Sequence, residues 1–301
     1  MTKKQMEANF ILLLTAGIWG FAFVSQRMGA ELMGPFAFNG IRFGLGAISL
    51  IPVIYYFERK EAKQIGKENV IKFDSKTTLI AGILCGFVLF SGSTLQQFGI
   101  TFTTAGKTGF ITALYIILVP LFGIFLKHKV GLNAWLGVAL ATVGLYFLCI
   151  TESFTIGLGD FVILIGAGFW ASHILIINYF TSKVSALRLA FFQFAFVSII
   201  SLIISSIFET TTFETVAALA LPILYNGFLS VAAAFTLQII GQKNAPPTLA
   251  SIILSMEAVF GAIGGWLILG EVLSSRELVG CVIMFVAIIV SQIPNKLKIQ
   301  A

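Results

Sequence analysis

The chain has 301 residues, of which 58% are apolar and only 11% charged, and its mean hydropathy is +0.99. A soluble globular domain carries about 25% charged residues, so this composition excludes a water-soluble fold and indicates a protein of the lipid bilayer. The net charge of +6 does not indicate a nucleic-acid partner, because the Lys and Arg residues are scattered over short loops and form no basic surface.

Apolar stretches of roughly 18 residues follow one another along the chain, each long enough to cross about 30 Å of hydrocarbon as a helix. Little of the sequence lies outside them. We therefore predict an all-α integral membrane protein with ten transmembrane helices, whose function lies inside the helix bundle. The predicted spans are Phe10–Met28, Pro35–Phe57, Thr77–Ile100, Thr108–Leu126, Leu132–Ile150, Phe161–Phe180, Leu187–Phe208, Val216–Ile240, Thr248–Leu269 and Leu278–Ile293.

The positive residues between these stretches predict their orientation. If the N-terminus is placed inside, most of the 19 Lys and Arg residues fall on the inner side, as the positive-inside rule requires. We therefore expect a multi-pass protein of the cell (inner) membrane with both termini in the cytoplasm.

The second half of the chain repeats the first. Phe10–Trp19 (FILLLTAGIW) recurs 151 positions later as Phe161–Trp170 (FVILIGAGFW), and Thr94–Gln96 (TLQ) recurs 142 positions later as Thr236–Gln238. Such self-similarity indicates two copies of one structural unit. Because each half holds five stretches, an odd number, the second copy would be upside down, as in many carriers. The sequence thus predicts two inverted five-helix repeats, residues 1–150 and 151–301, with a site between them.

The motifs also occur in a characteristic order: LTAGIWGFAF at residues 14–23, IRF at 41–43, GFITALYIILVP at 109–120 and MEAVFGAIGGWLILGE at 256–271. This order, over essentially the whole chain, resembles the EamA-type members of the drug/metabolite transporter superfamily. One departure is Ala258, where the family often has Pro, which leaves a kink in the ninth helix open. The resemblance implies a ten-helix bundle that moves small organic solutes, frequently outward, by alternating access.

Polar and aromatic residues deep in the spans are candidates for a solute-binding site. Glu257 lies nine residues into the ninth span, about 13 Å deep. An ionisable group there is costly and faces a cavity or a partner, so Glu257 would anchor an ammonium group, exchange protons, or serve as a packing carboxylate. Trp19 and Trp170 lie mid-span, away from the interfacial belts, and would form two walls of an apolar pocket or fill space between helices. Tyr115 is a similar case whose hydroxyl needs a partner.

Four further residues complete the predicted substrate-binding set. Lys107, near the outer mouth, would attract a carboxylate or snorkel to the interface. His173 would relay protons or hydrogen-bond across helices. Gln96 and Gln238, at equivalent positions of the two copies, would line two vestibules or hold helices together.

Outside this set, Arg42 is expected to snorkel outward or to meet Glu31. The sequence contains no HExxH pattern, and no metal, cofactor, nucleic acid or obligate protein partner is predicted.

Two functions from different classes follow. The first is a secondary transporter, acting as an exporter of small organic metabolites such as amino acids or drug-like solutes. Inward proton flow through Glu257 would drive it, with facilitated diffusion as the alternative. The second is an intramembrane enzyme acting on lipid-like substrates. That enzyme would need a nucleophile–base pair or a carboxylate cluster, which the spans do not supply, so we expect the transporter.

Overall fold

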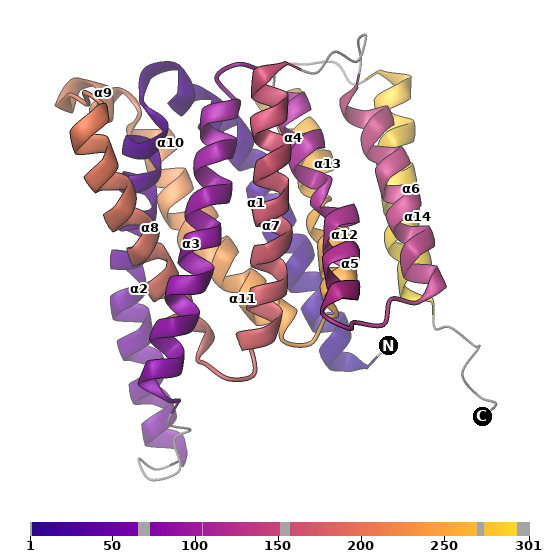
Figure 1. The fold of residues 1–301 in the computed structure, drawn as a ribbon, viewed down its shortest axis with the longest axis horizontal. Coiled ribbons are helices and arrows are strands. Elements are labelled where there is room, and N and C mark those ends of the chain that lie inside the picture. Colours follow the sequence, from indigo (N-terminus) through magenta and orange to yellow (C-terminus); the bar gives the residue numbers. More distant parts are fainter. Residues whose placement is uncertain (1, 66–72, 104, 151–156, 270–273, 294–301) are drawn as a thin grey trace.

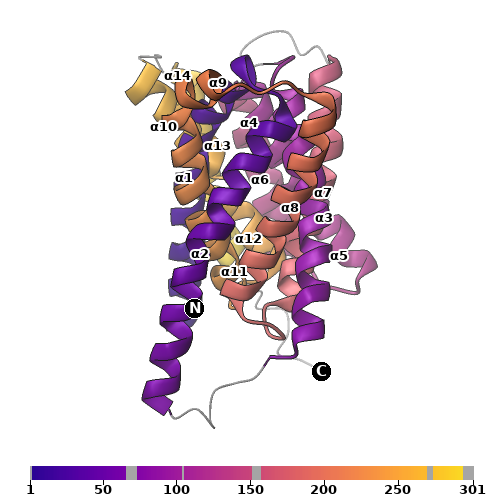
Figure 2. The same ribbon diagram turned by 90° about the vertical axis from the view of Figure 1, so that its left-hand side faces the viewer.

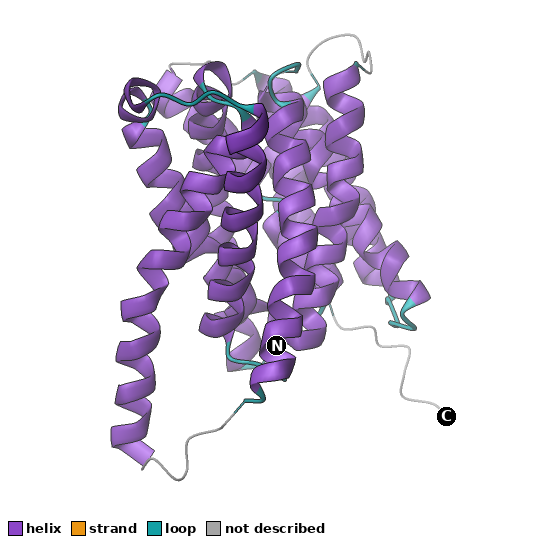
Figure 3. Ribbon diagram, turned by 60° about the vertical axis from the view of Figure 1, so that its left-hand side comes forward, coloured by secondary structure: helices purple, strands orange, loops and turns teal. Residues whose placement is uncertain are grey.

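The regular secondary structure is helical throughout the residues that the computed structural model describes, namely 2–65, 73–103, 105–150, 157–269 and 274–293. Within them, ten helical segments are long and apolar enough to cross a membrane. The predicted ten-span helical fold is therefore confirmed. The spans run side by side (Figure 3).

Most spans are single α-helices whose bounds lie close to the predicted ones. The first two helices are longer than predicted, because their polar ends continue the helix beyond the apolar stretch, and α2 protrudes past the bundle at the end where α1 begins (Figure 2). The single helices are α1 (Lys3–Leu32), α2 (Pro35–Ile65), α3 (Ser75–Gly99), α6 (Leu132–Cys149), α7 (Leu158–Phe180), α8 (Ala186–Phe208) and α14 (Ser275–Gln292).

The fourth, eighth and ninth spans are interrupted. The fourth consists of α4 (Ala105–Ala113) and α5 (Tyr115–Phe125). The short α9 (Phe213–Ala218) precedes the eighth, which continues through α10 (Ala220–Leu224), the π-helix η1 (Tyr225–Phe235) and α11 (Thr236–Gln242). The ninth consists of α12 (Pro247–Leu254), α13 (Glu257–Gly264) and the π-helix η2 (Gly265–Leu269).

The breaks in the fourth and ninth spans are alike. Leu114 has φ −61° and ψ −10°, and Ser255 has φ −62° and ψ −11°. At each break a backbone N–H bonds three residues back, from Leu114 to the Ile111 carbonyl and from Met256 to the Ile253 carbonyl. The ninth span is therefore interrupted although it lacks the family's proline after Glu257.

The helices enclose two main hydrophobic clusters. One is centred on α5, α6, α12 and α14, and the other on α2, α3, α8 and η1. The α6–α14 pair lies at one side of the bundle, whereas α2, α3 and α8 lie at the other (Figure 1). Trp19 and Trp170 pack against both clusters, which places them where the two meet.

A glycine allows α1 to approach α13 closely. A Cβ atom on Gly20 would lie 2.5 Å from the Cβ of Phe260 and 2.6 Å from the backbone nitrogen of Gly261. Small residues of this kind let helices pack where the lipid supplies no hydrophobic drive. One turn earlier on the same helix, a Cβ on Gly17 would meet only the Phe260 ring, at 4.0 Å.

We expect Gly20→Ala to destabilise the protein by about 1–3 kcal/mol, because the added methyl group forces α1 and α13 apart. Gly17→Ala should be neutral or slightly stabilising, since alanine favours a helix by roughly 1 kcal/mol over glycine and meets no clash there. Melting temperatures of the purified variants in one detergent measure the difference. Equal melting temperatures for the two variants would contradict the close α1–α13 contact.

Candidate functional site

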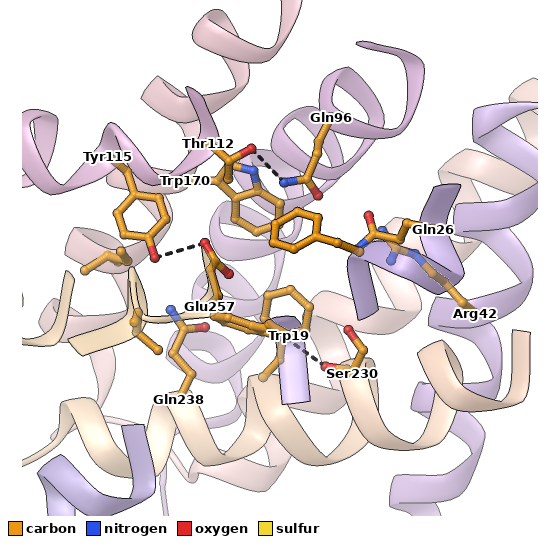
Figure 4. A pocket seen from close by; sticks show the side chains of 14 residues that line it. Trp19, Gln26, Arg42, Gln96, Thr112, Tyr115, Trp170, Ser230, Gln238 and Glu257 are labelled. Carbon is orange, nitrogen blue, oxygen red and sulfur yellow. Dashed lines mark hydrogen bonds between the residues drawn. The ribbon is translucent and has the colours of Figure 1, made fainter. Parts of the chain in front are cut away.

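A narrow cavity of about 40 Å³, which has room for a few water molecules, lies between the helices at the level of the two central tryptophans. Its walls come from α1, α2, α3, α4, α5, α7, η1, α11, α12 and α13. Six of the eight predicted site residues line this cavity, and all six are labelled in Figure 4. They are Trp19, Gln96, Tyr115, Trp170, Gln238 and Glu257. The structure thus brings together most of the residues that were selected by their depth in the spans or by their equivalence in the two copies.

Many of the lining residues occupy equivalent positions of the two copies. Trp19 and Trp170 are 151 positions apart, as in the first repeated motif, and Gln96 and Gln238 are 142 positions apart, as in the second. Tyr115 is likewise 142 positions before Glu257. Both glutamines line this one cavity, and Gln96 also donates from α3 to Thr112 Oγ1 on α4 at 3.0 Å.

Glu257 and Tyr115 meet directly. The Tyr115 hydroxyl donates a hydrogen bond of 3.2 Å to Oε1 of Glu257, and both side chains are buried. Each residue begins the helix that follows a break, Tyr115 in α5 and Glu257 in α13. The helix dipole favours a carboxylate in the first turn of a helix, so the break in the ninth span gives Glu257 a suitable position.

The two central tryptophans are separated by an aromatic ring that the sequence did not single out. The Phe235 ring lies 4.7 Å from that of Trp19, tilted by 58°, and stacks at 6.0 Å on that of Trp170 with an interplanar angle of 16°. The repeat gave no signal for it, because the position 142 residues earlier is Ser93. The Phe235 ring thus joins the two tryptophans in the apolar lining of the cavity.

Arg42 was wrongly expected to reach the outer surface or Glu31. Its side chain is buried and lines the cavity, and Glu31 pairs instead with Arg27, at 3.4 Å. The Arg42 guanidinium donates to two amide oxygens, from Nε to Asn39 Oδ1 at 2.9 Å and from Nη1 to Asn226 Oδ1 at 3.1 Å. The direction of the Arg42 side chain depends on Asn226, which lies on η1, far from Arg42 in the sequence. The sequence around Arg42 therefore could not predict this direction.

Two predicted residues remain, and the first of them, His173, is not part of the cavity lining. His173 is fully buried, and its Nε2 lies 2.9 Å from Gln193 Oε1. This contact between α7 and α8 matches the alternative in which His173 hydrogen-bonds across helices. The side chain of Lys107 lies outside the described part of the structure, so its role stays a prediction.

Comparison with known proteins identifies the group to which this chain is related. The model of the EamA-like transporter family matches residues 6–150 and 157–292. An uncharacterized transporter of Archaeoglobus fulgidus is 30% identical over 95% of this chain and 86% of its own length. The chain belongs to the EamA-like transporter family.

Other relatives agree with this family assignment. The uncharacterized transporter YoaV of Bacillus subtilis is 25% identical, over 89% of this chain and 90% of its own length. One solved crystal structure, only 16% identical, superposes with a TM-score of 0.77 over 95% of this chain and 96% of that chain, which shows the fold alone. The EamA-like chain is thus a multi-pass membrane transporter, and its apolar helices are the spans.

In this EamA-like protein, the indole N–H groups of the two central tryptophans differ in their hydrogen bonding. The Trp19 Nε1–H donates to the Ser230 carbonyl at 3.2 Å. The Trp170 Nε1–H is buried, and among the described residues it has no hydrogen-bond partner. Because a buried donor without an acceptor is costly, the Trp170 indole N–H contributes less to stability than that of Trp19.

We expect Trp19→Phe to lower the free energy of unfolding by about 1 kcal/mol more than Trp170→Phe, because only the first change removes an indole hydrogen bond. Both substitutions remove a similar volume, so each serves as the control for the other. Thermal melts of the two purified variants measure the stability difference. A larger loss for Trp170→Phe would contradict this assignment of the indole hydrogen bonds.

Proposed function

We propose that this protein is a secondary transporter that exports small amphipathic metabolites through the central cavity by alternating access. The observation that carries this proposal is the Tyr115–Glu257 contact. It joins the fourth and ninth spans at their breaks, where both side chains line one cavity. A buried ionisable group in a membrane marks a functional site by default, and helix breaks that line a cavity are where transporters place their solutes.

The lining suggests the form of the solute. Trp19, Phe235 and Trp170 offer flat apolar surface, and Glu257 with Tyr115 offers a polar pair that would hold an ammonium group. Ligand sites commonly occupy about 300–1,000 Å³, so the cavity, which is narrow in this conformation, would widen to admit such a solute. Amino acids and cationic drug-like molecules fit this description, because each combines an apolar body with a polar head.

Proton exchange at Glu257 would couple transport to the pH gradient. A carboxylate in a buried site is stabilised by a bound ammonium group or by a proton, and not by water. Solute and proton would therefore compete for Glu257, and inward proton flow would drive export of the solute.

We expect wild-type protein in proteoliposomes to move at least one solute from a panel of amino acids, nucleobases and cationic drugs. Acidifying the side that corresponds to the cell exterior should accelerate movement toward that side, because protons then enter as the solute leaves. Glu257→Gln should reduce this pH-driven flux at least tenfold, whereas Glu214→Gln, an exposed acid on α9, should leave it unchanged. Full pH-driven flux in Glu257→Gln would exclude Glu257 as the coupling residue.

We further propose that residues 1–150 and 151–301 are inverted repeats, with both termini in the cytoplasm. The two sequence offsets and the matching backbone hydrogen bonds of Leu114 and Met256 at the two breaks support the duplication, and the distribution of Lys and Arg supports the orientation. Exchange of the conformations of the two halves would then open the cavity alternately to either side.

Single cysteines test this topology in a background whose native cysteines are replaced. We expect Glu61→Cys, on the protruding end of α2, to react in intact cells only with a membrane-permeant thiol reagent. Thr211→Cys, before α9 at the opposite end of the bundle, should react with an impermeant one. Both native positions are exposed, so accessibility depends on the side of the membrane alone. The reverse pattern would overturn the orientation.

A further inference from the structure

We propose that Arg42 forms a carboxylate-binding subsite in the central cavity, so that the transported solutes carry a carboxylate group. This inference rests on the proposed transport function and narrows its substrate class. Arg42 would bind an anionic group at one end of the cavity, whereas Glu257 would bind a cationic group.

The position of Arg42 requires an explanation because a charged group within the membrane is costly. Arg42 lies seven residues into α2, about 10 Å from its start, and only 3% of its surface is exposed. The rings of Phe38 and Phe43 lie 5.4 and 5.1 Å from its guanidinium carbon. The side chain is therefore held inside the bundle and does not extend to water.

Hydrogen bonds fix the Arg42 guanidinium in place, but its described partners carry no negative charge to balance it. Its acceptors among the described residues are the neutral amide oxygens of Asn39 and Asn226. The Asn226 nitrogen donates to the Pro222 carbonyl at 3.0 Å, and the Asn39 nitrogen to Thr94 Oγ1 at 3.4 Å, which turns both amide oxygens toward Arg42. In the described part of the chain, no carboxylate lies within ion-pair distance of it.

An anion in the cavity would supply the missing charge. A guanidinium has five N–H donors in a planar fork that matches a carboxylate, and the two amide oxygens occupy only two of them. Arg42 lines the same cavity as Glu257, yet the two do not form an ion pair and are separated in Figure 4. A solute with a carboxylate toward Arg42 and an ammonium group toward Glu257 would satisfy both.

The second copy of the repeat does not reproduce this cation. The position equivalent to Arg42, 151 residues later, is Gln193, which contacts His173. The duplicated scaffold therefore accepts a neutral glutamine at this place. The positive charge of Arg42 is a property of one end of the cavity and is not needed to build a five-helix unit.

The test compares four ligands that share one aromatic body: phenylalanine, 3-phenylpropanoate, phenylalaninamide and phenethylamine. Binding to the full-length wild-type protein in nanodiscs is measured by calorimetry and by thermal stabilisation. We expect phenylalanine to bind at least tenfold more tightly than phenylalaninamide and phenethylamine, which lack the carboxylate. The same comparison with leucine, 4-methylpentanoate and 3-methylbutylamine covers an aliphatic body.

Variants of Arg42 assign the preference to this residue. Arg42→Gln should remove the advantage of the carboxylate ligands, and Arg42→Lys should keep part of it, because a lysine retains the charge without the fork. Arg59→Gln is the matched control, since Arg59 is an exposed arginine on the protruding end of the same helix and should leave the preference unchanged. If Arg42→Gln does not fold, the wild-type ligand comparison alone decides.

Two results would overturn the inference. The first is that the wild-type protein binds phenethylamine as tightly as phenylalanine. If that binding depended on Glu257, the proposed transport function would stand without the carboxylate subsite. The second is that the wild-type protein binds none of the carboxylate ligands at millimolar concentration. The proposed function itself then depends on the wider transport panel, which includes solutes without a carboxylate.

Discussion

The absence of water in the hydrocarbon core constrains every part of this structure. Each backbone N–H and C=O group there must be bonded within the protein, which is why every span is helical. A break in a helix is tolerated only where the freed groups face protein or a cavity. The breaks at Leu114 and Ser255 meet this condition, because the residues after them, Tyr115 and Glu257, face each other across the central cavity. The backbone constraint thus locates the site.

The cavity combines a repeated scaffold with chemistry that is not repeated. Equivalent positions of the two copies hold two tryptophans and two glutamines, which preserve its shape. Elsewhere the side chains have diverged: Tyr115 corresponds to Glu257, and Arg42 to Gln193. An amphipathic or charged solute cannot be matched by a symmetric site, because its two ends differ. Divergence at a few lining positions supplies the required polarity without disturbing the helix packing.

Hydropathy and depth predicted much of this arrangement, but not the direction of each side chain. The length of an apolar stretch fixes a span, and the cost of a buried charge identifies Glu257. Depth does not tell which side of a helix faces the cavity, however, so the snorkelling of Arg42 was a reasonable and wrong expectation until the contact with Asn226 on η1 was known. Phe235 was one of 30 phenylalanines, and the π-helix that ends with it changes the angular spacing of side chains in a way the periodicity does not reveal.

The places of the two charges in the bundle suggest how a solute would couple the halves. Arg42 lies on α2, which packs against α8 and η1, whereas Glu257 lies at the start of α13, which packs against α1. A solute that met both charges would connect α2 of the first half with α13 of the second through the middle of the bundle. Its binding energy would then depend on the relative position of the two halves, and a ligand shifts an equilibrium only by such a difference. An amine without a carboxylate would hold only α13, and so would favour one arrangement of the halves less strongly.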